Sequence, residues 1–215
     1  MGAIEYAIDN WDRLLEFALQ HIGFVLLSIV IATVIGVALG VLTYQRPTAA
    51  ALVIAVSATI LTIPSFALFG LGITFFGIGN LGPVIGLILY SQLPIVRNTI
   101  TGLQEVDPAV VESARGMGMS RWQSLWRIEL PLAWPVVLTG VRVATLIVTS
   151  IFAIAAYVGA SGLGREIDRG LSNLGAAWAF DVVLTATVAI VLVALVLDVL
   201  YMLIGKLTIP RGVRS

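Results

Sequence analysis

The stretch Glu112-Ser-Ala-Arg-Gly-Met-Gly-Met-Ser-Arg-Trp-Gln-Ser-Leu-Trp-Arg-Ile-Glu-Leu-Pro131 decides the architecture of this chain. It is a polar, glycine-containing segment that separates two long apolar runs. A protein that only had to cross a bilayer would connect these runs by a short turn. The chain instead uses residues 103–131 for a structured aqueous segment. This length indicates that the segment holds a partner outside the membrane.

Composition places the chain among integral membrane proteins. Of its 215 residues, 59% are hydrophobic and 11% are charged, whereas soluble domains carry about 25% charged residues. The formal net charge is zero, which gives no electrostatic reason to expect nucleic acid as a partner. The chain has no cysteine and one histidine, His21. We therefore expect no disulfide, no cysteine nucleophile and no metal site.

Five apolar segments approach the length of about 20 residues that a helix needs to cross the hydrocarbon core. They are His21–Tyr44, Ala49–Phe69, Leu81–Val96 with an extension to Leu103, Ala133–Tyr157 and Val182–Ile204. The expected fold class is an all-α integral membrane protein with five transmembrane helices, in which residues 1–215 form a single transmembrane domain. Pro64 lies inside the second segment and predicts a kink there. Gly36 and Gly40 permit close helix packing, within the chain or between subunits.

The distribution of positive charge predicts the orientation. With a cytoplasmic C-terminus, nine basic residues face inward, namely Arg46, Arg97, Arg115, Arg121, Arg127, Arg142, Lys206, Arg211 and Arg214. Three face outward, namely Arg13, Arg165 and Arg169. This bias follows the positive-inside rule. Residues 1–20 then form an extracytoplasmic N-terminal segment, either an interfacial helix or a mobile tail, and residues 103–131 form a cytoplasmic loop.

Helix signals occur throughout this cytoplasmic loop. Asp107-Pro108 is a good helix start, because aspartate can cap free N–H groups and proline suits the first helical position. Gly116 and Gly118 can adopt the left-handed conformation that ends helices. Ser120 is suited to cap a second helix. The prediction is a short helix, a glycine turn and a second short helix; the alternative is a re-entrant or interfacial loop that caps the bundle.

The spacing of these residues resembles the EAA motif of ABC importer permeases. The matching positions are Glu112, Ser113, Ala114, Gly118, Ile128, Leu130 and Pro131. Ser113 stands where that family usually has a second alanine, and serine is also small. Residues 24–205 extend the resemblance. Thr62-Ile-Pro-Ser-Phe66 and Gly159-Ala-Ser-Gly-Leu-Gly164 are similar to segments of the osmoprotectant branch, whose members carry glycine betaine, carnitine or choline.

The resemblance implies a type I ABC importer permease fold in the cytoplasmic membrane of a prokaryote. It implies two permease subunits, identical or paralogous, with two ATPase subunits and an extracytoplasmic solute-binding protein as partners, surrounded by membrane lipid. The residues implied in ATPase coupling are Glu112, Ser113, Ala114, Gly116 and Gly118, with Ile128, Leu130 and Pro131 as anchors of the loop. ATP and Mg²⁺ belong to the ATPase subunit, since this chain lacks a GxxxxGK[ST] phosphate loop. We expect no cofactor and no catalytic residue here.

Weaker signals concern the transport path. A quaternary ammonium substrate would favour aromatic faces, and Phe66, Tyr90, Phe152 and Tyr157 lie in or near the spans; packing is the alternative role. Asp198 lies within a span, where a charge is a functional candidate; a structural pair with Arg142 or with an interfacial lysine is the favoured interpretation. Arg165–Arg169 is either a docking surface for the binding protein or a solvated loop.

The alternative functions are an ABC permease for amino acids or another small solute, and, less favoured, a secondary transporter or channel subunit.

Overall fold

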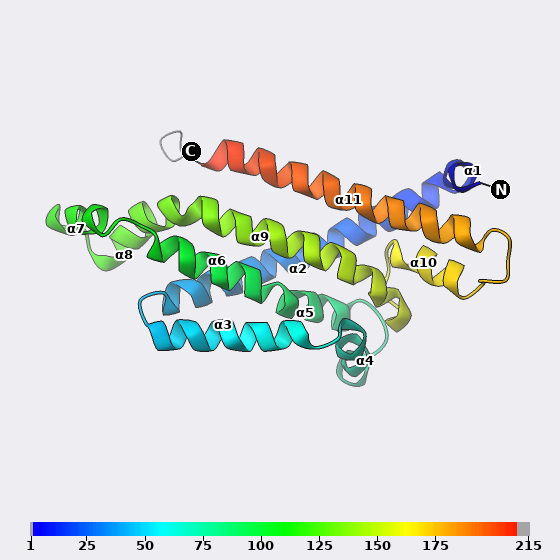
Figure 1. Cartoon of the computed structure of the whole chain (residues 1–215), viewed down its shortest axis with the longest axis horizontal. Helices are drawn as coiled ribbons and strands as arrows, with labels where there is room; N and C mark the ends of the chain where they lie inside the picture. Colours follow the sequence, from blue (N-terminus) through cyan, green and yellow to red (C-terminus); the bar gives the residue numbers. More distant parts are fainter. Residues whose placement is uncertain (1, 210–215) are drawn as a thin grey trace.

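The computed structural model describes residues 2–209, and all regular structure in that range is helical. The helices are α1 (Ala3–Asp9), α2 (Trp11–Thr43), α3 (Pro47–Thr62), α4 (Ser65–Phe76), α5 (Leu81–Tyr90), α6 (Gln92–Gln104), α7 (Pro108–Gly116), α8 (Arg121–Ser124), the π-helical turn η1 (Leu125–Glu129), α9 (Leu130–Phe152), the 3-10 turn η2 (Ala153–Val158), α10 (Gly164–Leu171) and α11 (Ala179–Thr208). The long helices run side by side along the longest axis of the molecule (Figure 1).

The centre of the bundle depends on glycines that let helices approach closely. A Cβ atom on Gly40 of α2 would lie 2.5 Å from Thr99 Cγ2 on α6, and one on Gly36 would lie 2.6 Å from Ile95 Cγ2. The Gly36–Gly40 pair therefore packs α2 against α6 within the chain. Gly140 has the same role in α9, where a Cβ atom would lie 2.6 Å from the backbone oxygen of Pro94.

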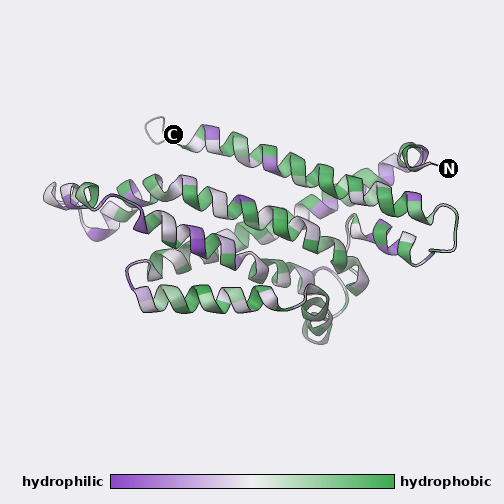
Figure 2. Cartoon of the chain, viewed as in Figure 1, coloured by the Kyte–Doolittle hydropathy of each residue, from purple (hydrophilic) through white to green (hydrophobic). Residues whose placement is uncertain are grey.

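The surface of the bundle is apolar along its length. Large side chains such as Val34 on α2, Leu52 on α3 and Val196 on α11 are each more than half exposed. Figure 2 shows hydrophobic residues along α3 and α11, with hydrophilic ones gathered around α7 and α10. Exposed apolar surface of this extent marks contact with a membrane or with another protein.

The prediction of five spans is confirmed only in part. Within residues 2–209, three helical runs are long and apolar enough to cross a membrane, namely Trp11–Thr43, Arg121–Val158 and Ala179–Thr208. The predicted span Ala49–Phe69 is not one helix, because α3 ends at Thr62 and α4 turns away from it by 93°. Ile63 is extended, as expected of a residue before proline. The effect of Pro64 is therefore a sharp break between two helices.

The predicted third span is also divided. Helices α5 and α6 contain 10 and 13 residues and meet at Ser91, so neither alone has the length of a full crossing. Two other helices are longer than the apolar segments predicted from the sequence. Helix α2 begins at Trp11 rather than His21, which leaves only α1 as a separate element of the predicted segment 1–20. Helix α11 extends the predicted fifth span at both ends.

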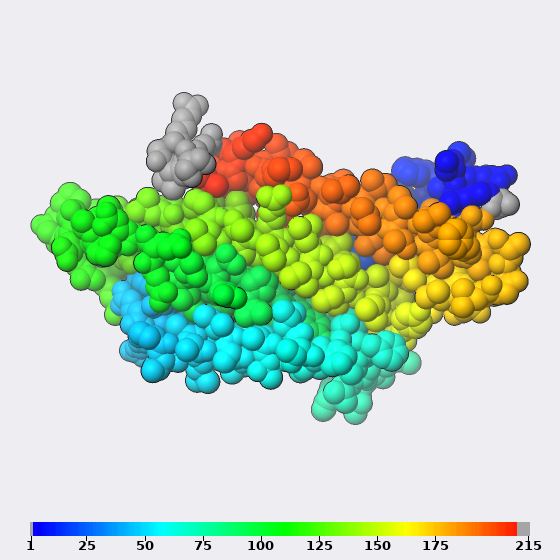
Figure 3. Space-filling view, viewed as in Figure 1, coloured from blue at the N-terminus to red at the C-terminus, as the bar shows by residue number. Residues whose placement is uncertain are grey.

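The two ends of the bundle carry different features. Figure 1 shows α7, α8 and the α2–α3 turn at one end, with α1 and α10 at the other. The C-terminal end of α11 lies at the α7–α8 end, whereas the N-terminus lies at the opposite end (Figure 1). The space-filling view shows α7 and α8 projecting beyond the neighbouring helices (Figure 3). The loop 103–131 is thus the most protruding part of its end.

Candidate functional site

Helix α7 is capped at both ends by residues that the sequence predicted, Asp107 at its start and Gly118 at its end. The Asp107 side chain accepts a hydrogen bond from the backbone N–H of Ala109 at 2.8 Å. At the other end, the N–H of Met119 bonds to the oxygen of Ala114, and the N–H of Gly118 bonds to that of Arg115. These two bonds form a Schellman motif, in which Gly118 has a φ of +84°. Gly118 is therefore the residue that turns the chain out of α7.

The predicted coupling residues divide by exposure. Glu112, Ser113, Gly116 and Gly118 are exposed on α7 and its turn. Ala114 is only 1% exposed and packs inside the loop, so its side chain does not belong to the outer surface. A Cβ atom added at Gly116 or Gly118 would have no neighbour within 4 Å. The exposed coupling residues are thus small apart from Glu112, and Arg115 and Met117 are exposed among them.

The second half of the loop differs from its prediction. Ser120 caps α8 as expected, and its side chain and that of Gln123 form a capping box. The expected second short helix, however, is not a separate element. The π-helical turn η1 joins α8 directly to α9 and η2 in a 38-residue helical run. Within that run Ile128 and Leu130 are half-buried and Pro131 is exposed in the first turn of α9.

The run from α8 to α9 encloses a buried carboxylate that sequence reasoning missed. Glu129 is 5% exposed. Its two oxygens accept hydrogen bonds from the Tyr44 hydroxyl at 2.7 Å and from the Ser124 hydroxyl at 2.9 Å. The bond to Tyr44 ties the start of α9 to the end of α2. The only signal in the sequence was an acidic residue among apolar ones, within the EAA-like segment itself.

The four aromatic residues proposed for a transport path do not converge. The rings of Phe66 and Tyr157 lie edge to face with centroids 6.0 Å apart, and both are about half exposed. Tyr90 and Phe152 are each 1% exposed in the core. The Tyr90 hydroxyl donates to the backbone oxygen of Ile63 at 2.7 Å, at the break between α3 and α4.

The structure brings Arg142 and Asp198 together across α9 and α11. Their contact consists of two hydrogen bonds of 2.5 and 2.7 Å. Both residues lie well inside long apolar helices, where an unpaired charge is costly.

The segment Arg165–Arg169 is neither a plain loop nor fully exposed. It lies in α10, where Glu166 is 2% exposed. The Glu166 carboxylate accepts a hydrogen bond from the Tyr6 hydroxyl and pairs with Arg13 at 3.2 Å and Arg169 at 3.7 Å. Burial, followed by the bond to Glu166, raises the pKa of the Tyr6 hydroxyl, so the hydroxyl keeps the proton that it donates. This cluster fastens α1 and the start of α2 to α10.

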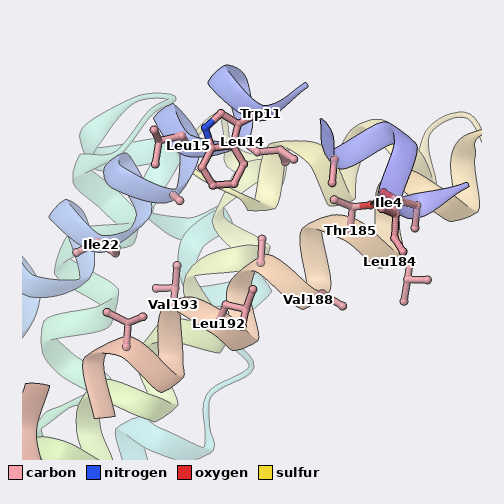
Figure 4. A pocket seen from close by; sticks show the side chains of 15 residues that line it. Ile4, Trp11, Leu14, Leu15, Ile22, Leu184, Thr185, Val188, Leu192 and Val193 are labelled. Atoms are coloured by element: carbon pink, nitrogen blue, oxygen red, sulfur yellow. Dashed lines mark hydrogen bonds between the residues drawn. The ribbon is translucent and has the colours of Figure 1, made fainter. Parts of the chain in front are cut away.

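A hydrophobic groove of about 490 Å³ lies between the N-terminal helices and α11. Figure 4 shows Trp11, Leu14 and Ile22 from α2 on one side, with Leu184, Val188 and Leu192 from α11 on the other. Its lining contains neither a charged residue nor any of the four aromatic residues proposed for a path.

Several characterised proteins are similar to this chain over nearly its full length. The osmoprotectant import permease protein OsmW of Salmonella typhimurium is 40% identical, with all of both chains covered. The carnitine transport permease protein OpuCB of Listeria monocytogenes is 34% identical, covering 96% of this chain and 93% of that protein. The choline transport system permease protein OpuBB of Bacillus subtilis is 30% identical, with coverage of 98% and 95%.

Solved structures show the same fold. An inward-facing structure of the MetNI methionine ABC transporter has a TM-score of 0.74 at 24% identity, covering 94% of this chain and 96% of that one. A model of the family described as binding-protein-dependent transport system inner membrane component matches residues 17–211. The predicted resemblance to importer permeases is therefore confirmed, and the chain belongs to the family of inner membrane components of binding-protein-dependent transport systems.

Proposed function

We propose that this chain is the permease subunit of an ATP-driven importer for a quaternary ammonium osmoprotectant such as glycine betaine, carnitine or choline. The substrate class rests on the relatives named for osmoprotectant, carnitine and choline transport at 30–40% identity. ATP is hydrolysed by separate ATPase subunits, and an extracytoplasmic solute-binding protein delivers the substrate. A second copy or a paralogue completes the membrane pathway.

The observation that carries this proposal is the geometry of α7. A helix fixed at both ends and projecting beyond the bundle is a suitable surface for a cytoplasmic subunit (Figure 3). Glu112 and Ser113 with the turn Gly116–Gly118 form the docking surface. Because α8, η1 and α9 form one helical run, a displacement of α7 is transmitted directly into the membrane. Ile128, Leu130 and Pro131 anchor the loop to that run.

The proposed topology has five crossings. The bent pair α3–α4 counts as one crossing and the consecutive pair α5–α6 as another, in addition to the three long runs. The N-terminus then lies outside and the C-terminus in the cytoplasm. This arrangement places the α7–α8 end inside, in agreement with the excess of arginine on that side.

Uptake of labelled solutes tests the proposal. Cells that lack other uptake systems for these solutes would express the permease with its cognate ATPase and binding protein, at low and high osmolarity. We expect saturable uptake of a quaternary ammonium compound that disappears when the ATPase is inactivated. Uptake of labelled methionine alone would overturn the substrate class and favour an amino-acid permease.

Crosslinking tests the docking surface separately. The natural chain contains no cysteine, so Ser113→Cys introduces a single thiol on the exposed face of α7. We expect this thiol to crosslink to the ATPase subunit. A thiol introduced at Ser172, exposed at the opposite end of the bundle, is the matched control and should not react with the ATPase. Equal crosslinking at both sites would overturn the assignment of α7.

A further inference from the structure

A second, polar pocket lies at the α7–α8 end of the bundle. It has a volume of about 390 Å³ and lies between the end of α2 and α8. Its lining residues are Val41, Leu42, Gln45, Arg46, Arg121, Trp122 and Leu125. Two of these are arginines and none is acidic, so the pocket is positively charged.

Neither Arg46 nor Arg121 has a carboxylate partner within residues 2–209. The ion pairs in that range involve Arg13, Arg142 and Arg169. Arg121 donates one hydrogen bond, to the side-chain oxygen of Gln45 at 2.6 Å. Two guanidinium groups lining one pocket repel each other unless an anion lies between them. The pocket therefore favours an anionic ligand.

A chain of hydrogen bonds fixes the geometry of this pocket. Glu129 accepts from the Tyr44 hydroxyl at 2.7 Å, and that hydroxyl accepts from the Gln45 side-chain nitrogen, also at 2.7 Å. The nitrogen of Gln45 is thereby directed at Tyr44, which leaves its oxygen for Arg121. One arginine is thus oriented before any ligand binds, and a preorganised site loses less entropy on binding.

The pocket is bordered by apolar surface on the side of the spans. Leu42 is 67% exposed on α2, and Trp122 is 63% exposed beside it on α8. Trp126, one turn further along, is 65% exposed. Exposed tryptophans gather where the hydrocarbon meets the headgroups. The pocket therefore combines a charged part with an apolar part, as a phospholipid does.

We propose that this pocket binds the phosphate headgroup of an anionic phospholipid such as phosphatidylglycerol. Guanidinium groups suit phosphate because they offer paired N–H donors. Arg46 and Arg121 hold the phosphate, and Leu42 and Trp122 contact the glycerol and the upper acyl chains. A free phosphate ion would satisfy the arginines but would leave the two exposed apolar side chains uncovered.

Lipid binding to the purified full-length permease tests this site directly. Tail-labelled phosphatidylglycerol and phosphatidylcholine would be titrated against the protein in a zwitterionic detergent. We expect the wild type to prefer phosphatidylglycerol by about 30-fold, from two basic contacts at a membrane surface. Arg46→Gln with Arg121→Gln should abolish the preference. Arg46→Gln alone breaks no hydrogen bond within the described residues and should lower the preference while the thermal unfolding temperature stays unchanged.

The matched control is Arg127→Gln, because Arg127 is exposed at the same end but does not line the pocket. It should keep the full preference for phosphatidylglycerol. The proposal is overturned if wild type binds both lipids equally, or if Arg127→Gln weakens binding as much as Arg46→Gln does. It is also overturned if inorganic phosphate displaces the lipid at equal concentration, which would identify a free-anion site. None of these readouts depends on which solute is transported.

Discussion

Arg142 on α9 and Asp198 on α11 form a two-point ion pair, with Nε–Oδ1 and Nη2–Oδ2 distances of 2.5 and 2.7 Å. Both side chains are partly exposed, at 40% and 20%. The pair therefore lies at the surface of the described chain rather than in its core. Both residues lie on apolar helices that are long enough to cross a membrane, where charged side chains pair with one another.

Removing one member of this pair should be more harmful than removing both. We expect Arg142→Gln, which leaves Asp198 as an isolated charge on an apolar helix, to lower the amount of inserted protein and its unfolding temperature. Arg142→Gln combined with Asp198→Asn should restore much of the loss. The measurement is thermal unfolding of the purified variants. A double variant less stable than either single one would contradict a role limited to mutual compensation.

Glu166→Gln should release α1 from α10. The substitution removes the charge that holds Arg13 and Arg169, while the shape of the side chain is kept. Loss of charged hydrogen bonds of this kind costs about 1–3 kcal/mol, so amide hydrogen exchange in α1 should accelerate. Glu16→Gln is the control, because Glu16 is an exposed carboxylate whose one side-chain hydrogen bond within residues 2–209 comes from Gln20, on the same helix. Unchanged exchange in α1 of the Glu166 variant would show that the Glu166 charge is not needed to hold the helix.

The fold class followed from composition and the apolar runs, because lipid exposure requires long stretches without charge. Asp107 and Ser120 were correctly identified as residues that cap helix starts, and Gly118 as one that ends a helix, because caps and left-handed turns depend on local chemistry. The break at Pro64 was foreseen as a kink, but its angle of 93° was not. That angle depends on the packing of α4, which a local signal does not encode.

The buried carboxylates were missed for a related reason. Glu166 lies in a charged segment, Arg165–Arg169, whose sequence is typical of a solvated surface. Its burial depends on Tyr6 and Arg13, more than 150 positions away in the sequence. Similarly, Glu129 is satisfied by Tyr44, 85 positions away. Long-range partners of single residues cannot be inferred from local spacing, whereas helix periodicity and caps can.

Gly140→Ala should destabilise the crossing of α6 and α9. The added Cβ atom would lie 2.6 Å from the Pro94 oxygen and 2.7 Å from Asn98 Cβ. Because backbone cannot move aside cheaply, we expect a loss of about 1–3 kcal/mol, measured by unfolding of the purified protein. Gly23→Ala on α2 is the control, since no atom lies within 4 Å of its added Cβ. Equal stability of both variants would show that the helices separate easily at Gly140.

Gly118→Glu should abolish transport while leaving insertion intact. Its φ of +84° strains any residue with a side chain by about 1–2 kcal/mol, and the carboxylate would project from the proposed docking surface. The fold of the bundle should survive, because no atom lies within 4 Å of the added Cβ. Gly175→Glu, at an equally open glycine between α10 and α11, should retain uptake. The measurements are labelled-solute uptake and co-purification of the ATPase. Full uptake by the Gly118 variant would mean that the turn after α7 makes no contact needed for coupling.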